Sequence, residues 1–402
     1  MGAPCLMRDP DGYFAHVRGR LAAFDDEAAR TSARLEAEQR RPALLASTRA
    51  RLAERLAATE ALGSHVTALF EGFDRAGPST DAHREPILSN LHYLHRDWGW
   101  TRETDEHARA LELVTSVVTA PLGTTAVLGA GAGRLAYDLH LDRGGAVTLA
   151  LDVDPLLVAA SVRVVAGASI PFVEAPANPF DIEALSREWT LVAPRGPAED
   201  LHVVVADALA PPLAEGAFDT VVTPWFIDQI VPDLRRFLGV LRSLLRPGGR
   251  WIFFGPLIYP ASLAPSLRFT RQEMTELAEL AGFTIERSVE GKLDFSRSPL
   301  TKNGRTERCF AFAASTGEPR SRTRDGRPAW LVLPWRPVPR PATWLGGEIR
   351  PAARAILDLV EGERSISDIA SVLTKTLAKA DLPTLEDAVR HCLSGHHPDA
   401  AA

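Results

Sequence analysis

The sequence predicts an α/β fold of the Rossmann-like type, in which parallel strands present a ligand site at their carboxyl ends. An apolar run over residues 126–128 breaks into alternating glycines over residues 129–133, and helix-like apolar spacing resumes from Leu135. This is the pattern of a strand, a tight turn and a helix. Two later apolar runs end in acids, Asp152 and Asp207, as the following strands of such a fold do.

The chain begins with a predicted helical region, residues 1–118. Between residues 13 and 73, apolar side chains recur at helical spacing among Ala, Arg and Glu, which predicts two or three amphipathic helices. Residues 92–100 then form the densest cluster of aromatic and histidine residues. The two histidines of this cluster have no thiolate or third histidine at a supporting spacing, so we predict no metal site.

Residues 119–315 are predicted as the α/β domain, and the glycine turn opens it. Glycine lets the backbone bend sharply and lets a ligand approach without a Cβ in the way. A dinucleotide-binding turn would place its third glycine at position 134, where this chain has Arg134. The spacing G-x-G-x-G is instead typical of S-adenosylmethionine (SAM) methyltransferases. The alternative is an ordinary glycine-rich turn.

Acids follow the next two predicted strands. Asp152 ends a strand about twenty residues after the turn, where a carboxylate accepts both ribose hydroxyls of a nucleotide. We expect Asp154 to cap the helix that starts at Pro155. Asp207 ends the strand of residues 201–206 and is expected to accept a hydrogen bond from the adenine amino group. Alternatively, each acid is a solvated strand end.

The rest of the domain has conventional strand and helix signals. A long insert, residues 171–200, is predicted to contain a short helical piece over residues 182–189. A helix is predicted between Thr270 at its start and Gly282 directly after its end. Further strands are predicted over residues 218–222, 251–254, 283–285 and 308–313, the last two as an antiparallel pair.

The C-terminal part is predicted as a linker rich in Pro and Arg, residues 316–343, and a small helical domain, residues 344–402. Three helices are expected there, over residues 353–361, 368–377 and 385–393. Ser367 is the expected cap of the second helix. A DNA-binding winged helix would need several basic residues on that helix, and it offers only Lys375. A protein or peptide contact is therefore favoured over DNA, beside a packing or dimerisation role.

Bulk properties favour a soluble, cytoplasmic protein. The chain has 402 residues, a net charge of −6 and three scattered cysteines. Mild acidity argues against a nucleic-acid partner recognised by bulk charge. Without a signal-peptide pattern, an apolar run long enough to cross a membrane or a disulfide framework, the sequence indicates a reducing cytosol and no membrane partner.

Four patches in the middle of the chain resemble the carnosine N-methyltransferase family. They are Arg96-Asp97-Trp98, the turn from Gly129 to Leu135, the run from Val222 to Asp228, and the run from Trp251 to Tyr259. The resemblance covers about residues 12–314. It implies a seven-stranded, class I SAM-dependent fold with an added helical region, and methyl transfer to an imidazole nitrogen of a histidine-containing dipeptide.

The same resemblance implies a catalytic pair, Asp228 and Tyr259, in which Asp228 holds the substrate imidazole. An imidazole attacks the methyl carbon only as a neutral ring, and a carboxylate bonded to its other N–H fixes the tautomer. The alternative is that Asp228 merely starts a helix. The residues expected to hold SAM are Gly129, Ala130, Gly131, Gly133, Arg134, Asp152, Val153, Asp207, Ala208 and Pro224. Those expected at the substrate are Trp98, Trp225, Phe226, Asp228, Tyr259 and Phe295.

This chain departs from the family at three places. Pro260 stands where the family has a histidine after its Gly-Pro-Leu-Leu-Tyr motif, and Phe295 stands near the place of a tyrosine. Glu106-His107 replaces a Glu-Arg pair of the family. SAM binding is therefore better supported than carnosine as the acceptor.

Three functions follow. The leading prediction is an N-methyltransferase that acts on a small histidine-related compound, with SAM as its cofactor. Residues 344–402 are similar to the PqqD-type peptide-binding fold, which adds the alternative of a ribosomal peptide or other natural-product intermediate held by that module. The third is a SAM- or peptide-binding scaffold without catalysis.

Overall fold

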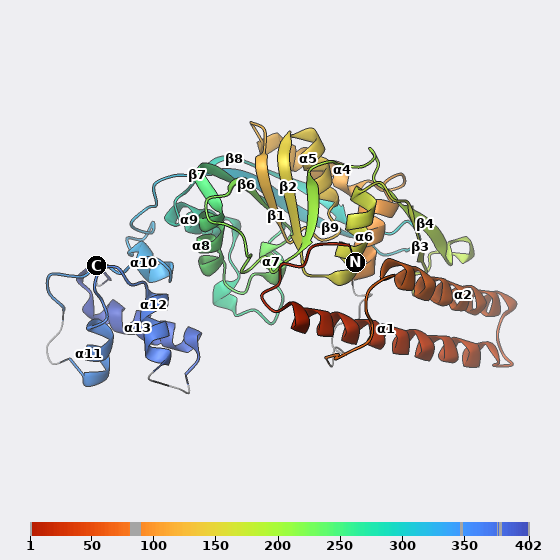
Figure 1. The fold of residues 1–402 in the computed structure, drawn as a ribbon, viewed down its shortest axis with the longest axis horizontal. Coiled ribbons are helices and arrows are strands. Elements are labelled where there is room, and N and C mark those ends of the chain that lie inside the picture. The colour runs from red at the N-terminus through yellow and green to blue at the C-terminus, as the bar shows by residue number, and fades with distance from the viewer. Residues whose placement is uncertain (1, 81–89, 346–348, 376, 378–379, 401–402) are drawn as a thin grey trace. The chain divides into compact units, whose positions relative to one another are not determined.

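The computed structural model describes residues 2–80, 90–345, 349–375, 377 and 380–400 (Figure 1). Its main feature is a seven-stranded sheet with the strand order β5-β2-β1-β6-β7-β9-β8. The strands are β1 (Gly123–Leu128), β2 (Gly145–Asp152), β5 (Leu201–Val205), β6 (Phe218–Pro224), β7 (Leu245–Gly255), β8 (Phe283–Phe295) and β9 (Arg305–Thr316). The predicted α/β class with a Rossmann-like, seven-stranded sheet is confirmed.

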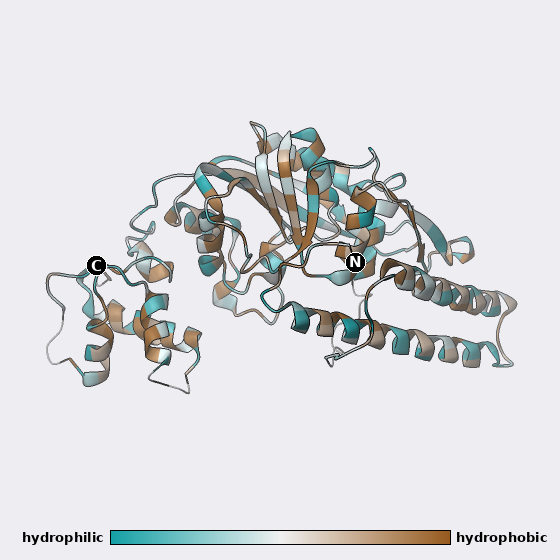
Figure 2. Cartoon of the chain, viewed as in Figure 1, coloured by the Kyte–Doolittle hydropathy of each residue, from teal (hydrophilic) through white to brown (hydrophobic). Residues whose placement is uncertain are grey.

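Strands β1, β2, β5 and β6 run parallel to one another. β1 pairs with β2 and with β6, and β2 pairs with β5. Because the carboxyl ends of parallel strands meet at one edge of a sheet, the residues that follow these four strands share that edge. Strand burial supports this arrangement, since every residue of β6 except Asp219 is buried, as expected for a strand covered on both faces. Figure 2 shows hydrophobic residues, in brown, in the strands of the sheet.

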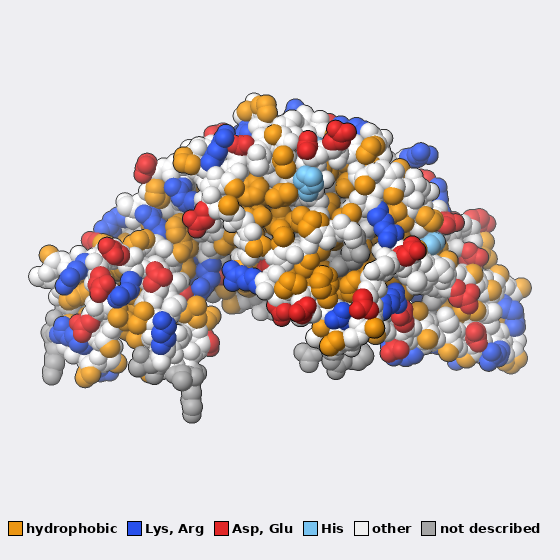
Figure 3. Space-filling model, in the orientation of Figure 1, with side chains coloured by type: hydrophobic (Ala, Val, Ile, Leu, Met, Phe, Trp, Pro, Cys, Tyr) orange, Lys and Arg blue, Asp and Glu red, His pale blue; other side chains and the backbone are white. Residues whose placement is uncertain are grey.

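Two long helices form the N-terminal region, α1 (Pro10–Gln39) and α2 (Ala46–Leu69). They pack against each other as a helical hairpin (Figure 1), so residues 13–73 are largely helical. On the face drawn in Figure 3, basic and acidic side chains are interspersed along this hairpin. After it come α3 (Leu91–Leu94), a π-helical turn (His95–Gly99) and α4 (Glu106–Val117).

The insert between β2 and β5 is a hairpin rather than a helix. α5 (Arg134–Asp142) and α6 (Pro155–Val165) flank β2, and an antiparallel pair, β3 (Ile170–Glu174) and β4 (Arg187–Leu191), follows. The expected helical piece is only one turn, Ile182–Ala184, and Trp189 lies in β4. Glu174 of β3 links this hairpin to Trp100, which precedes it in the chain. Its carboxylate accepts hydrogen bonds from the indole N–H groups of Trp100 and of Trp189 in β4, at 3.0 and 2.9 Å.

The chain divides into two compact units, whose boundaries differ from the sequence-based domain boundaries. The first unit comprises residues 1–226, 252–256 and 287–313, and the second comprises residues 227–251, 257–286 and 314–402. The second unit contains the predicted linker, in which Trp330 and Leu331 are buried in the same hydrophobic cluster as the C-terminal helices.

Helices of the second unit follow local capping rules. They are α7 (Ile227–Ile230), α8 (Leu234–Leu244), α9 (Arg271–Leu280), α10 (Ala329–Val332), α11 (Pro351–Leu357), α12 (Ile366–Thr374) and α13 (Leu382–His396). Thr270 caps α9 as predicted and forms a capping box with Glu273. The predicted cap of α12 was wrong by two residues. Ser365 forms that capping box with Asp368, while the Ser367 hydroxyl donates to Glu386 at 2.5 Å.

In the described part of the chain, no helix combines the length and apolar character needed to cross a membrane. Nor do the described residues bring three or more His, Cys, Asp or Glu side chains together in an arrangement that could hold a metal ion.

Candidate functional site

The glycine turn between β1 and α5 takes the conformation that its sequence requires. Gly129, Gly131 and Gly133 have φ values of 66°, 59° and 85°, in the left-handed region that favours glycine. The three positions differ in their surroundings. A Cβ on Gly129 would lie 2.1 Å from the Phe226 ring, whereas a Cβ on Gly131 would meet nothing within 4 Å. Gly129 therefore accommodates Phe226, and Gly131 leaves open space on the turn.

Asp152, at the end of β2, binds the glycine turn directly. One carboxylate oxygen accepts the Gly131 N–H at 2.8 Å, and the other accepts the Asp154 N–H at 2.8 Å. Burial raises the pKa of Asp152 to about 6, although both N–H groups lower it. The carboxylate that the sequence predicts as a ribose ligand thus lies beside the one glycine of the turn that faces open space.

Val153 and Asp154 complete this edge after β2. Val153 is 46% exposed, an unusual exposure for a large apolar residue beside a buried acid. Asp154 accepts the N–H groups of Leu156 and Leu157 at 3.0 and 3.1 Å, so it caps α6 as predicted. A flat apolar ligand that covered Val153 would remove this exposed surface from water.

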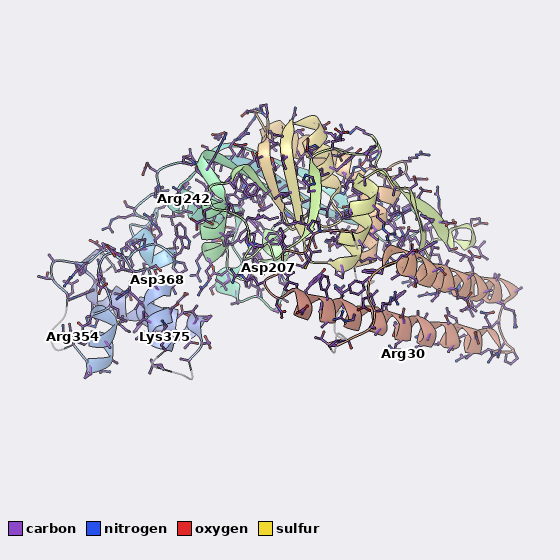
Figure 4. All side chains as sticks on the ribbon, viewed as in Figure 1. Arg30, Asp207, Arg242, Arg354, Asp368 and Lys375 are labelled. Atoms are coloured by element: carbon purple, nitrogen blue, oxygen red, sulfur yellow. The ribbon has the colours of Figure 1, made fainter. Side chains whose placement is uncertain are left out.

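Two further predicted cofactor residues follow β5. Asp207 is half-buried and accepts the Leu209 N–H at 2.9 Å, and Ala208 is 5% exposed. Figure 4 labels Asp207. Because β5 is parallel to β2 and pairs with it up to Asp152 and Val205, Asp207 lies on the same edge of the sheet as Asp152.

Two predicted ligand-contacting side chains lie in the core behind the glycine turn. Trp98 has 0% exposure, and its indole N–H donates to the Ala132 carbonyl at 2.7 Å. Arg134 is 4% exposed and donates to Asp138 at 2.7 Å and to the Asp97 carbonyl at 3.0 Å. Trp98 has no exposed surface, and its indole is occupied by a bond to the glycine turn. Both side chains support the turn from within.

A buried ion-pair cluster lies next to this turn, and sequence reasoning identified only part of it. Asp97 accepts from Arg96 at 2.7 Å and from His107 at 2.8 Å. Burial alone would raise the pKa of Asp97, but the charges and hydrogen bonds of Arg96 and His107 outweigh it and lower that pKa. The Glu106-His107 pair, which departs from the family sequence, is the signal that could have identified α4 as part of this cluster.

Three aromatic rings surround Arg96. Its guanidinium carbon lies 4.9, 5.1 and 5.3 Å from the ring centres of Tyr93, Trp225 and Phe295, distances at which cation–π attraction acts. Trp225 and Phe295, both predicted at the substrate, are thus brought together. Glu106 fixes the backbone after Phe295, because its carboxylate accepts the N–H groups of Ser296 and Arg297 at 2.8 and 2.7 Å.

Trp225 adopts a strained backbone directly after Pro224, the buried last residue of β6. Its φ is 47°, and its N–H donates to the Phe254 carbonyl at 2.7 Å. The indole Nε1 of Trp225 is buried without a hydrogen-bond partner in the described part of the chain. Backbone strain and an unpaired buried donor cluster at ligand sites, where a ligand supplies the missing acceptor.

The second unit contains the predicted catalytic pair. Asp228, 2% exposed, accepts the Ile258 N–H at 2.6 Å, and the Gln229 amide donates to the Ile258 carbonyl at 2.6 Å. Residues 228 and 229 therefore hold the segment that leads to Tyr259. Burial and the Asp228 charge raise the pKa of Tyr259, so its phenol stays protonated at neutral pH.

Known proteins are similar to parts of this chain. Residues 183–296 match the model of a family described as carnosine N-methyltransferase. A carnosine N-methyltransferase of Dictyostelium discoideum is 40% identical over 47 residues, which are 12% of this chain and 10% of that protein. The match confirms the predicted resemblance to this family, and it agrees with the predicted methyltransferase class and SAM cofactor.

Two solved structures are each similar to a little over half of this chain. A SAM-dependent methyltransferase of Aquifex aeolicus is 16% identical, with a TM-score of 0.35 over 56% of this chain and 97% of that one. A possible histamine N-methyltransferase of Thermotoga maritima is 16% identical, with a TM-score of 0.34 over 58% of this chain and 98% of that one.

We expect Gly129→Ala to destabilise the protein more than Gly131→Ala. Both alanines would adopt a positive φ, which costs about 1–2 kcal/mol. Only Gly129→Ala also drives a Cβ into Phe226, an overpacking cost of about 1–3 kcal/mol. Urea denaturation of both variants measures this difference. Equal losses of unfolding free energy would contradict the packing of Phe226 on Gly129.

Proposed function

We infer that this chain is a SAM-dependent N-methyltransferase that acts on an imidazole nitrogen of a small histidine-related compound. The observation that carries this proposal is the pairing of Asp152 with the Gly131 N–H on a glycine turn whose outer face is open at Gly131. When bound, SAM supplies a methyl group already activated on its sulfonium, so the protein has little acid–base chemistry to perform.

The residues of the turn fit SAM. A carboxylate offers about four acceptor positions, more than the backbone N–H groups of Gly131 and Asp154 occupy on Asp152, so it can also accept from a ribose hydroxyl. Val153 offers an exposed apolar face for the adenine, and Asp207 an acceptor for its amino group. We also assign Gly129, Ala130, Gly133, Ala208 and Pro224 to this site, and Arg134 as the residue that supports it from the core.

We propose that Asp228 orients the acceptor. Both Asp228 and Tyr259 lie within the residues matched to the carnosine N-methyltransferase family. A buried carboxylate bonded to one imidazole N–H leaves a lone pair on the other nitrogen, which is the nucleophile that methyl transfer requires. Burial of Asp228 favours this function because it strengthens a charged hydrogen bond. Trp225, Phe226 and Phe295 of the first unit and Tyr259 of the second are the other residues that we assign to the acceptor.

Mass spectrometry tests the proposal. The purified protein is incubated with methyl-labelled SAM and, separately, with histidine, histamine, carnosine and imidazole-free amines of similar size. We expect the label on an imidazole nitrogen of at least one histidine-related compound. Label found only on the imidazole-free amines would overturn the acceptor assignment. SAM uptake without any product would favour a binding scaffold.

Asp152 makes the affinity for SAM depend on pH. Burial raises its pKa to about 6, and ribose hydroxyls bond more strongly to the ionised carboxylate than to the neutral acid. Affinity should therefore be constant above about pH 7 and fall below pH 6, by up to about tenfold per unit. The free energy of unfolding changes in the opposite direction. Because the pKa of Asp152 is raised in the folded state, that state binds the proton more tightly than the unfolded state does, and it gains stability as the pH falls. Calorimetric titration with SAM between pH 5 and 8 measures the affinity, and an affinity that stays flat below pH 6 would contradict the assignment.

A second candidate acceptor is a histidine residue in a peptide bound by residues 344–402. The support is that helices α11, α12 and α13 share a hydrophobic cluster, as a small recognition module requires. Peptide recognition predicts a lower KM for a histidine-containing peptide of about twenty residues than for free histidine dipeptides.

A cytoplasmic location is supported by Cys5, Cys309 and Cys392, which are all free thiols.

A further inference from the structure

The N-terminal segment, residues 4–20, contacts the proposed cofactor edge at three separate places. The first is an extension of the sheet beyond β5. The Val205 N–H donates to the Pro4 carbonyl at 2.9 Å, and the Leu6 N–H donates to the Val205 carbonyl at 2.8 Å. These bonds form a parallel bridge two residues before Asp207, so the segment covers the edge strand next to the predicted adenine ligand.

Tyr13 makes the second contact. It lies on α1, is 8% exposed, and its hydroxyl donates to the Val153 carbonyl at 3.1 Å. Burial and the nearby charge of Asp154 raise the pKa of Tyr13, so the hydroxyl remains a donor throughout the physiological range. This bond fixes the peptide group between Val153, the exposed apolar platform, and Asp154.

Arg20 makes the third contact, about two turns further along α1. Its guanidinium donates to Asp154 at 3.1 Å, and the two residues are 4% and 6% exposed. Asn90 donates to the same Asp154 oxygen at 2.8 Å. The other oxygen of Asp154 caps α6, so Arg20 and α6 together hold this carboxylate.

The tripeptide Asp152–Val153–Asp154 is therefore held from two sides. Gly131 binds it from the glycine turn, while Tyr13 and Arg20 bind it from α1. Both sets of bonds leave the Val153 side chain exposed. A ligand that must meet Asp152 and Val153 at once gains affinity when the backbone between them is fixed before binding.

We propose that residues 4–20 are a positioning part of the cofactor site, and that their docking and SAM binding stabilise each other. This inference rests on the proposed binding of SAM. Tyr13 and Arg20 act through the tripeptide of residues 152–154 and touch no reacting atom. By linkage, the factor by which a docked segment raises SAM affinity equals the factor by which SAM favours docking.

Three variants test the positioning function. Tyr13→Phe removes a single hydrogen bond, and we expect SAM binding to weaken about three- to tenfold. Arg20→Met leaves Asp154 with one partner fewer, and we expect a loss of about tenfold or more. Arg30→Met is the matched control, because Arg30 lies on the same helix but outside this segment, donates to the exposed Glu27 at 3.1 Å, and is expected to change SAM affinity less than about twofold.

A purely structural function is distinguished by kinetics. We expect the KM for SAM to rise in Tyr13→Phe and Arg20→Met, while kcat at saturating SAM and the KM for the acceptor stay within about twofold. Titrations are made well below each melting temperature, so that only folded protein is compared. Should Arg20→Met fail to fold, Tyr13→Phe carries the test alone. Unchanged SAM affinity in folded Tyr13→Phe would overturn the inference while leaving the proposed function intact.

Hydrogen exchange tests the reciprocal effect on the parent protein. We expect SAM to slow amide exchange in residues 4–20, including the Leu6 N–H bonded to Val205, relative to the exposed end of α1 near residue 36. Slowing confined to residues 129–154 would overturn the coupling. A protein that takes up no SAM at all would instead overturn the proposed function, and this inference with it.

Discussion

Asp228→Asn is expected to reduce kcat by about 10²- to 10⁴-fold, with SAM affinity unchanged. That range applies to carboxylates that fix the tautomer of an imidazole. An asparagine oxygen can still accept the Ile258 N–H that Asp228 accepts at 2.6 Å, so the segment before Tyr259 stays in place. What is lost is the negative charge that favours the imidazole tautomer with a free lone pair on the attacking nitrogen. Single-turnover kinetics with labelled SAM measures the chemical step.

Gln229→Ala is the matched control for Asp228→Asn. Gln229 donates to the carbonyl of the same residue, Ile258, at 2.6 Å, but it carries no charge. We expect kcat to change by no more than about threefold, since one exposed hydrogen bond contributes little. Equal losses in both variants would show that Asp228 only holds the segment of residues 257–259, and the acceptor assignment would then fail.

Patterns within about twenty residues of each other predicted the local structure of the residues to which we assign the cofactor. The glycine turn, Asp152 and the capping residue Asp154 are local signals, because a tight turn, a strand end and a helix start each restrict the residue types that fit. Their spacing then placed them at one edge of a parallel sheet. The structure agrees with these predictions through bonds between neighbours in the fold, such as that from the Gly131 N–H to Asp152.

Side-chain direction was not predictable in the same way. Trp98 and Arg134 lie in motifs that resemble the family, but a motif does not reveal which side of the turn a side chain occupies. The structure directs both into the core. Their partners, Ala132 and Asp138, illustrate the reason, since the packing of the π-helical turn against α5 decides the direction. The β3–β4 hairpin was not predictable for a similar reason, because Glu174 bonds to the indoles of Trp100 and Trp189, which are not its neighbours in the sequence.

The Glu106-His107 pair makes structural contacts that its departure from the family sequence does not reveal. Read as a sequence, the pair weakens the resemblance to the family. In the structure His107 pairs with Asp97 at 2.8 Å, and Glu106 holds the backbone of Ser296 and Arg297. α4 thus connects the ion-pair cluster of Arg96 and Asp97 to the end of β8, where Phe295 lies.

Asp152→Asn is expected to weaken SAM binding by about 10²- to 10⁴-fold, which corresponds to two charged hydrogen bonds of about 1.5–3 kcal/mol each. Both oxygens of Asp152 accept backbone N–H groups, from Gly131 and Asp154. An asparagine has one acceptor oxygen, so its NH₂ group must face one of these donors. The variant therefore loses a bond that shapes the turn as well as the charge that binds ribose. Calorimetric titration with SAM measures the loss directly.

Asp219→Asn separates loss of binding from loss of stability. Asp219 also accepts a backbone N–H, that of Thr124 at 2.7 Å, but it lies at the start of β6, and its neighbour Thr220 pairs with Thr125 of β1. Because the strands are parallel, this is the edge opposite to the glycine turn. Asp219→Asn should lower the melting temperature and leave SAM affinity within about twofold. Were both variants to weaken SAM binding equally, Asp152 would be a structural acid like Asp219, and the ribose would have to meet another group on the sheet edge.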